Sequence, residues 1–423
     1  MPIYAATRDQ SYRKSFPMRA ADSLSSFALS DLGWLAIFNL LLFQTTIQNT
    51  TGFSFIDEAA TGIAILISLF SSAWRLYQGR AGKWVHHCSF CLALLVFWGV
   101  TSNLISRVAI GCSPIIIDLY ACVKFPIALV CMVAVLHERQ RLYRAVEAEC
   151  RFFVVVLLAF GIANLFIQIG DFGNDPRYGL RASYRFVFGH PEMLVFVCVG
   201  IVLVFARDYR RNIRWIFVAL MVMCLSLRSK GIAFAAVTLL LVVSWGHRGK
   251  LSFIHVLFGA LAAIAIGWDQ YQYYFMSSGF ARTELTKAAV QIANSYFPFG
   301  SGFGTYGSNI TADSRYYSPL YFKYGLSAVY GLIPGDVSFL SDVFWPIVIG
   351  QFGWAGLILY CVMLVALILG VYRFASEGGQ RLCVVLCFAF LLISSTAESA
   401  FFHPNAIYLA FCLALALVRK VPE

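Results

Sequence analysis

Apolar stretches that are each long enough to cross a bilayer recur along nearly the whole sequence. Crossing about 30 Å of hydrocarbon takes roughly 20 helical residues. Of the 423 residues, 60% are hydrophobic and 13% charged, and the mean hydropathy is +0.75, which excludes a soluble globular domain. The sequence predicts an all-α, polytopic membrane protein with about 12 transmembrane helices. These spans are placed at 31–48, 57–74, 88–108, 114–136, 151–170, 191–206, 213–227, 231–247, 251–268, 343–371, 381–396 and 404–419.

The net charge of +11 follows the alternation of the connections between spans and does not indicate a nucleic-acid partner. Cytoplasmic connections of membrane proteins carry an excess of lysine and arginine. Assigning the basic connections to the cytoplasm places both termini there, and the polar first 30 residues lack the pattern of a cleaved signal peptide. The basic connections are Arg8 to Arg19, Arg75 to Lys83, Arg139 to Arg144, Arg207 to Arg214, Arg248 and Lys250, Arg373 and Arg381, and Arg419 and Lys420.

This topology divides the chain into three parts. Residues 1–268 hold a cytoplasmic N-terminal segment and the first nine spans, 269–342 form one large extracytoplasmic loop subdomain rich in aromatic residues, and 343–423 hold the last three spans. Within the loop, 281–294 has the periodicity of an amphipathic helix lying on the membrane surface. None of the twelve cysteines falls in the loop, so we expect buried free thiols.

Some outer connections retain cations against the topological bias. The connection 171–190 carries Arg177, Arg181 and Arg185, a tight turn carries Arg228 and Lys230, and the long loop carries Arg282. Salt bridges to nearby acidic residues are one explanation. An anionic ligand explains the set better, because the planar fork of arginine suits phosphate oxygens.

Further ionisable side chains fall at the same membrane level. His190, Glu192, Asp342, Glu398 and His403 all lie near the outer ends of predicted spans, beside the aromatic loop. Together with the arginines they predict an amphipathic cavity that faces outward. Asp118 and Lys124 lie deeper in the fourth span, and their spacing places them on different helix faces, so they are not expected to be simply each other's partner.

Three separated segments carry a resemblance to a known family. One is the segment Arg185 to Glu192, which opens a span; another is Leu227 to Gly231; the third is the ordered series of Arg282, the glycine-rich stretch 298–304, and Asp342, which ten residues separate from Gly353. In these segments the chain resembles the O-antigen polymerase and O-antigen ligase superfamily, membrane glycosyltransferases of the GT-C type. Ligases of that superfamily carry histidine where this chain has Asp342, which favours a polymerase.

The resemblance implies a GT-C-like fold in the bacterial inner membrane with its active site facing the periplasm. It implies a polymerase of envelope polysaccharide that transfers a growing glycan from polyprenyl diphosphate to a lipid-linked repeat unit. A flippase and a chain-length regulator would be its protein partners, besides membrane lipids. Asp342 would be the general base, with Arg282 and Arg228 as catalytic cations. Substrate binding would fall to Arg185, Arg181, Arg177, Lys230, His190 and Glu398.

No cofactor or metal is expected, because the sequence has no Asp-x-Asp pair for a divalent cation and arginines would replace the metal. Three alternatives stay open at this point. A ligase for finished polysaccharide, or another lipid-linked glycan transferase, would share every motif, and a transporter or flippase would share the composition. Asp342 could instead cap the helix that follows it, where an anion interacts favourably with the helix dipole.

Overall fold

The computed structural model confirms an α-helical membrane protein. The residues that it describes form helices and no strand longer than an isolated bridge. They comprise 29–70, 82–167, 169–170, 172–173, 183–248, 279–308, 311, 315–340 and 342–419, with isolated residues between 261 and 272.

The helices lie where the apolar stretches predicted them. Four are long and apolar enough to cross a membrane: α5 (Gly82–Ser106, apolar from Lys83), α6 (Cys112–Leu136), α7 (Gln140–Phe166) and α14 (Trp345–Phe374). The shorter apolar helices are α1 (Leu29–Leu42), α8 (Pro191–Ala206), α10 (Ser229–Arg248), α15 (Gly378–Ser394) and α16 (Asn405–Ala416). The remaining helices are α2 (Gln44–Thr51), α3 (Ile56–Phe70), α9 (Tyr209–Leu225), α12 (Ala281–Ser295), α13 (Pro319–Lys323) and the 3₁₀ helix η3 (Leu326–Ala328).

One predicted span is divided. The segment 31–48 forms α1 and α2, which meet at Phe43. The sequence of α2, Gln-Thr-Thr-Ile-Gln-Asn-Thr-Thr, is polar, and Gln44 donates a hydrogen bond to Asn405 at the start of α16. A polar helix gains nothing from facing lipid, and Thr46 of α2 likewise donates to a protein group, the carbonyl of Val187 at 3.0 Å. The predicted span 251–268 lies largely outside the described residues.

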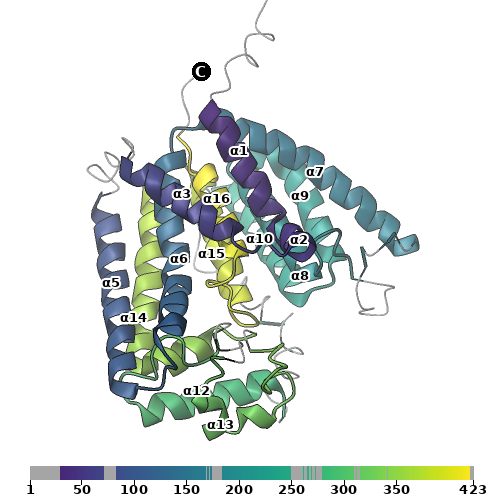
Figure 1. The fold of residues 1–423 in the computed structure, drawn as a ribbon. Helices are drawn as coiled ribbons and strands as arrows, with labels where there is room; N and C mark the ends of the chain where they lie inside the picture. The colour runs from purple at the N-terminus through teal and green to yellow at the C-terminus, as the bar shows by residue number, and fades with distance from the viewer. Residues whose placement is uncertain are drawn as a thin grey trace, which may run out of the picture.

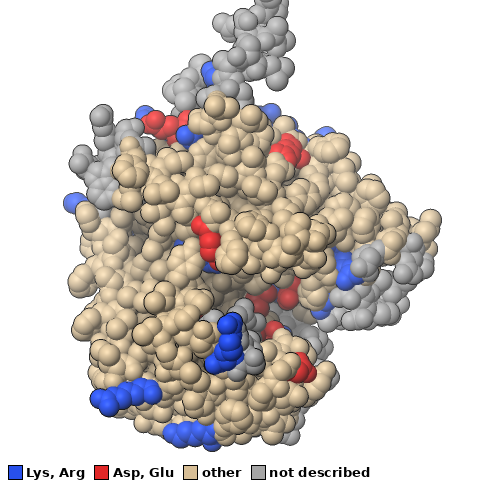
Figure 2. Space-filling model, viewed as in Figure 1, with Lys and Arg blue, Asp and Glu red and all other residues tan. Residues whose placement is uncertain are grey.

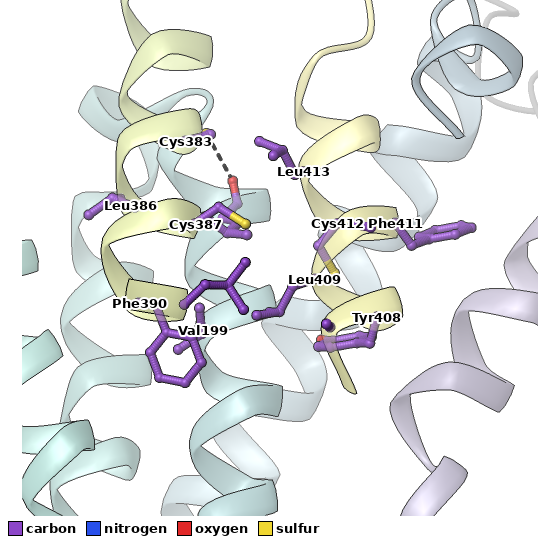
Figure 3. Packing of buried hydrophobic residues seen from close by; sticks show 14 of the residues in the cluster. Val199, Cys383, Leu386, Cys387, Phe390, Tyr408, Leu409, Phe411, Cys412 and Leu413 are labelled. Carbon is purple, nitrogen blue, oxygen red and sulfur yellow. Dashed lines mark hydrogen bonds between the residues drawn. The ribbon is translucent and has the colours of Figure 1, made fainter. Parts of the chain in front are cut away.

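The centre of the bundle is apolar on every side. Nearly all side chains of α8 and α16 are buried, because α8 packs against α9, α15 and α16, while α16 also packs against α6. A helix that is hydrophobic all round belongs in such a position. Figure 3 shows the contact between α15 and α16, where Cys387 and Cys412 pack among aliphatic side chains and Cys383 Sγ lies 3.2 Å from the carbonyl of Leu203.

The cysteines are free, as predicted, but five of the twelve are not buried, and Cys91 and Cys131 among these are half-buried. Cys112, Cys224 and Cys361 are exposed on α6, α9 and α14. Large apolar side chains on the outer faces of the helices are exposed as well, among them Phe90 (70%) and Phe97 (67%) of α5. Such an apolar surface is far too extensive for a protein in water and fits a lipid surrounding.

A second hydrophobic cluster lies apart from the bundle core. It gathers α12, the segment 306–343 and the start of α14 around Leu285, Tyr306, Tyr321 and Ile347. Figure 1 shows α12 and α13 at the end of the molecule opposite to the C-terminus. The predicted amphipathic helix at 281–294 is present as α12, and its apolar face packs into this cluster and against α14.

The connections between helices gather at two opposite ends of the bundle. The connections at 137–140, 207 and 418–419 are joined by Arg207, which donates to Gln140 and Val418, and by the bond from Arg419 N to His137 O. We call this the basic end. The connections that hold the residues of the three sequence motifs, together with α12, form the opposite end, called the site end below.

Candidate functional site

Arg282 and Asp342 form an ion pair at the site end. Arg282 lies on the second residue of α12 and Asp342 in the connection before α14, with Arg282 Nη2 and Asp342 Oδ2 3.0 Å apart. Both positions are fixed by the second hydrophobic cluster, in which Leu285 of α12 and Val343 are fully buried. The two charged side chains stay partly accessible, at 18% and 31%. The carboxylate predicted as a base and an arginine predicted as a catalytic cation are therefore partners.

Asp342 does not cap α14. The N-cap residue of that helix is Phe344, and no side chain caps it. The capping interpretation of Asp342 is therefore wrong, since its carboxylate turns to Arg282 instead. Burial raises the pKa of Asp342 above its usual range, although the Arg282 guanidinium lowers it. Glu192 and Lys230 also influence this pKa, so they lie near the pair.

Lys230 is the centre of a buried ionic cluster. It lies on the second residue of α10, and its Nζ is 2.8 Å from Glu192 Oε1 and 2.6 Å from Glu398 Oε1. Ser394 at the end of α15 bonds to Glu398 as well. Two carboxylates around one ammonium leave the cluster with one negative charge, which cations nearby must offset. Lys230 and Glu398, both predicted to bind substrate, thus bind each other.

Arg228 completes this cluster through His190. Arg228 Nη2 lies 3.0 Å from His190 Nε2, and His190 Nδ1 lies 3.6 Å from Glu192 Oε2. His190 Nδ1 also accepts a hydrogen bond from the backbone N–H of Glu192 at 3.3 Å and thereby caps the start of α8. Polar contacts therefore run without a break through Arg228, His190, Glu192 and Lys230.

The backbone beside two of the arginines is held in an unusual conformation. Phe186, next to Arg185, and Leu227, next to Arg228, both have φ of 52°. The left-handed region costs an ordinary side chain roughly 1–2 kcal/mol. The two turns support each other, because Tyr184 N donates to Leu225 O at 3.0 Å. Strain of this kind is concentrated at functional sites in proteins, which makes these turns a sign of a site.

Of the other three predicted arginines, only Arg185 lies in the described part of the chain. Arg185 Nη1 donates to the carbonyl of Gly189 at 2.8 Å, inside its own turn. Arg177 and Arg181 lie outside the described residues. In the ionic cluster, the Asp342–Arg282 pair and Arg185 together, four cations (Arg185, Arg228, Lys230, Arg282) accompany three carboxylates (Glu192, Asp342, Glu398), so this set is positive by one charge.

The glycine-rich stretch 298–304 packs on a kink in α14. Gly353 has φ of 67° inside that helix, which releases carbonyls from the helical ladder. Ser301 N and Gly302 N donate to the carbonyls of Gly350 and Gln351 at 3.0 and 2.7 Å. A Cβ on Gly353 would lie 2.5 Å from Pro298 O, so only glycine allows this approach. The third motif is thus one structural unit that holds the start of α14.

Asp118 and Lys124 have separate partners, as their spacing predicted. Asp118 accepts a hydrogen bond from Gly304 N at 2.7 Å and thereby fastens the glycine-rich stretch to α6. Lys124 pairs with Asp57 and, at 3.0 Å, with Glu58 of α3. Neither α3 carboxylate was expected at the site from the sequence, because an acidic residue at a helix start is ordinary.

A cavity of about 340 Å³ lies between α2, α3, α6 and the turn before α16. Its lining adjoins the ionic cluster through Met193, Ser399 and His403, and His403 stacks on Phe196 with ring centroids 5.3 Å apart. Amide, hydroxyl and carboxylate groups and two phenylalanines share the walls: Gln44, Gln48, Ser54, Asp57, Asp118, Ser308, Ser399, Asn405, Phe53 and Phe402. Of these lining residues, the sequence predicted only His403 to lie at the site.

The face shown in Figure 2 is hollowed above the level of α12 and α13, and acidic side chains gather in that hollow with basic ones at its edge. Much of the rest of this face carries no charge. No protein-family model matches the sequence, and no curated protein matches it significantly.

Proposed function

We propose that this protein is a membrane glycosyltransferase that polymerises an envelope polysaccharide from polyprenyl-diphosphate-linked repeat units. The observation that carries the proposal is the ion pair between Asp342 and Arg282, beside the cationic turn at Arg228 and Lys230. A sugar transfer from a diphosphate needs a base for the acceptor hydroxyl and cations for the leaving group, and both lie at the site end.

In the proposed reaction the acceptor hydroxyl of one lipid-linked unit attacks the anomeric carbon of the other. The bond from that carbon to the diphosphate oxygen breaks, and the hydroxyl proton passes to Asp342. Protonation removes the negative charge that Arg282 compensates. The guanidinium charge then becomes available to the diphosphate, so proton transfer and stabilisation of the leaving group are coupled.

The aromatic and polar cavity next to the ionic cluster supports a glycan substrate. Amide and hydroxyl groups can hydrogen-bond to sugar hydroxyls, while the rings of Phe53 and Phe402 offer apolar faces. The four cations and three carboxylates of the ionic cluster, the Asp342–Arg282 pair and Arg185 leave only one surplus positive charge. A diphosphate with more than one negative charge would therefore also depend on groups that change their charge during the reaction, as Asp342 does.

Deleting the gene and examining the envelope polysaccharide tests the proposal. We expect single repeat units to remain where polymer is normally made, and the wild-type gene to restore polymer. Accumulation of lipid-linked polymer would instead identify a ligase. Unchanged polysaccharide together with a defect in substrate uptake or export would identify a transporter and contradict the proposal.

A further inference from the structure

A second cavity, of about 580 Å³, lies at the basic end of the molecule. It is distant from the candidate site, because α8 begins with Pro191 at the site and ends with Ala206 beside the cavity, and its 16 residues span about 24 Å. Its volume is within the usual range for a small-molecule site of roughly 300–1,000 Å³. Nothing in the proposed glycosyl transfer uses it.

Three helices begin at this cavity. The first residues of α7, α9 and α15, which are Gln140, Tyr209 and Gly378, all line it. The start of each helix carries partial positive charge and unsatisfied N–H groups, which attract anions. No side chain caps α7 or α9. The helix starts are packed closely, since a Cβ on Gly379 would lie 1.9 Å from Arg207 O.

Arginines dominate the charged groups of the lining. Arg144, Arg207, Arg210 and Arg211 face three carboxylates, those of Glu147, Asp208 and Glu377. One of these carboxylates is already paired with a cation outside the lining, because Glu147 Oε1 lies 2.7 Å from Arg151 Nη2. The cavity is therefore electropositive.

Arg207 is the independent sign of a ligand. Its side chain is 2% exposed, its Nη2 donates to Gln140 Oε1 and Val418 O at 2.8 and 2.9 Å, and its guanidinium lies 4.0 Å from the centre of the Tyr143 ring. Its Nε and Nη1 are buried and have no hydrogen-bond partner in the part of the chain that the structure describes. The charge of a buried guanidinium is costly when it is not compensated, so a negative charge in the cavity beside Arg207 would stabilise the fold.

We propose that this cavity binds a phosphate group, carried by the headgroup of an anionic phospholipid or by a soluble phosphate compound. The proposal does not depend on the glycosyltransferase function. Tyr143, Tyr209 and Trp245 in the walls suit the boundary between lipid and water, where amphipathic rings are favoured. Basic pockets between membrane helices are known to take lipid phosphates.

The full chain, purified in an uncharged detergent, is titrated with inorganic phosphate, with dihexanoyl phosphatidylglycerol and with dihexanoyl phosphatidylcholine, and its thermal midpoint is followed. We expect a saturable rise with phosphatidylglycerol or phosphate. A response to phosphatidylglycerol alone identifies a lipid site. A response to both phosphatidylglycerol and inorganic phosphate identifies a site that binds the phosphate group itself.

Substitutions of the arginines in the lining test whether the ligand binds in this cavity. Arg210→Gln combined with Arg211→Gln changes two exposed residues and should weaken the apparent affinity by at least tenfold, and Arg207→Lys should weaken it similarly because the fork is lost. Arg214→Gln is the matched control, since Arg214 is exposed on the same helix but does not line the cavity. Absence of any saturable rise, or equal weakening by Arg214→Gln, would overturn the proposal.

Discussion

A carboxylate that acts as a base must be ionised when the acceptor hydroxyl arrives, and the surroundings of Asp342 set the pH at which this holds. Asn at 342 still accepts a hydrogen bond from Arg282 but cannot take a proton. We therefore expect Asp342→Asn to reduce turnover by roughly 10²–10⁴-fold at unchanged membrane levels. Purified enzyme with short lipid-diphosphate repeat units is assayed by product length.

Asp336→Asn is the control for Asp342→Asn. Asp336 lies in the same connection, is partly accessible, and accepts a hydrogen bond from Ser338 Oγ at 2.7 Å, outside the ionic cluster. Its removal should leave product length unchanged. Wild-type polymer from Asp342→Asn would eliminate the base assignment.

The pKa of Asp342 predicts opposite effects of pH on activity and stability. Because burial raises this pKa, activity should fall with decreasing pH at a higher pH than for an ordinary aspartate of pKa about 3.9. The folded state binds this proton more tightly than the unfolded state, so Asp342 contributes stability at low pH that is lost as the pH rises through its folded pKa. Asp342→Asn should remove both dependences, which pH profiles of turnover and of thermal midpoint would show. Identical profiles in the variant would contradict the assignment.

Arg228 and Arg282, which we propose stabilise the leaving group, make a separate prediction. Arg228→Ala or Arg282→Ala should abolish polymer while the protein still accumulates, because diphosphate charge is left uncompensated. Lysine at either position should restore little polymer, since it keeps the positive charge but cannot form the bidentate contact that a guanidinium makes. Lys287→Ala on α12 is the control, because Lys287 is 56% exposed and pairs only locally, with Glu284 at 2.8 Å. Normal polymer from both alanine variants would leave these arginines with a structural role.

At the scale of elements, the helices of the bundle were predictable because apolar periodicity is local to each segment. The pairing of elements was not. Glu398 follows α15, Lys230 begins α10 and Glu192 begins α8, and nothing local to these segments indicates that they meet. That these residues lie at one end of the bundle was therefore predictable from the order of the spans, whereas the ion pairs, the cavity and the α3 carboxylates at Lys124 required the fold.

The kink at Gly353 carries a prediction for a whole element. Gly353→Ala forces a left-handed φ on alanine, at roughly 1–2 kcal/mol, and its Cβ would also meet Gly300 N at 2.7 Å. We expect a lower thermal midpoint and loss of polymer, because the glycine-rich stretch no longer holds the start of α14. Gly62→Ala in α3 is the control, since its Cβ would meet nothing within 4 Å. An unchanged midpoint for Gly353→Ala would show that the kink tolerates a side chain.

At the scale of the molecule, the two ends differ in charge in the manner that the connections predicted. Arg139, Arg207 and Arg419 lie together at the basic end, while the ionic cluster, the cavity of the candidate site and α12 lie at the other. An alternating topology requires such a division, because each span carries the chain from one end to the other. The basic end would then face the cytoplasm.

Reporter fusions test this orientation. We expect fusions at 80, 142, 209, 248 and 376 to score cytoplasmic, and fusions at 52, 180 and 310 to score extracytoplasmic. Positions 142 and 209 probe the basic end directly, since Gln140 and Tyr209 line its cavity, and position 310 follows Ser308, which lines the cavity of the candidate site. Lipid-linked repeat units are polymerised on the extracytoplasmic side in the proposed reaction. A cytoplasmic score at 310 would therefore place the Asp342 and Arg282 pair on the wrong side of the membrane and end the proposed mechanism, even if every mutant above behaved as expected.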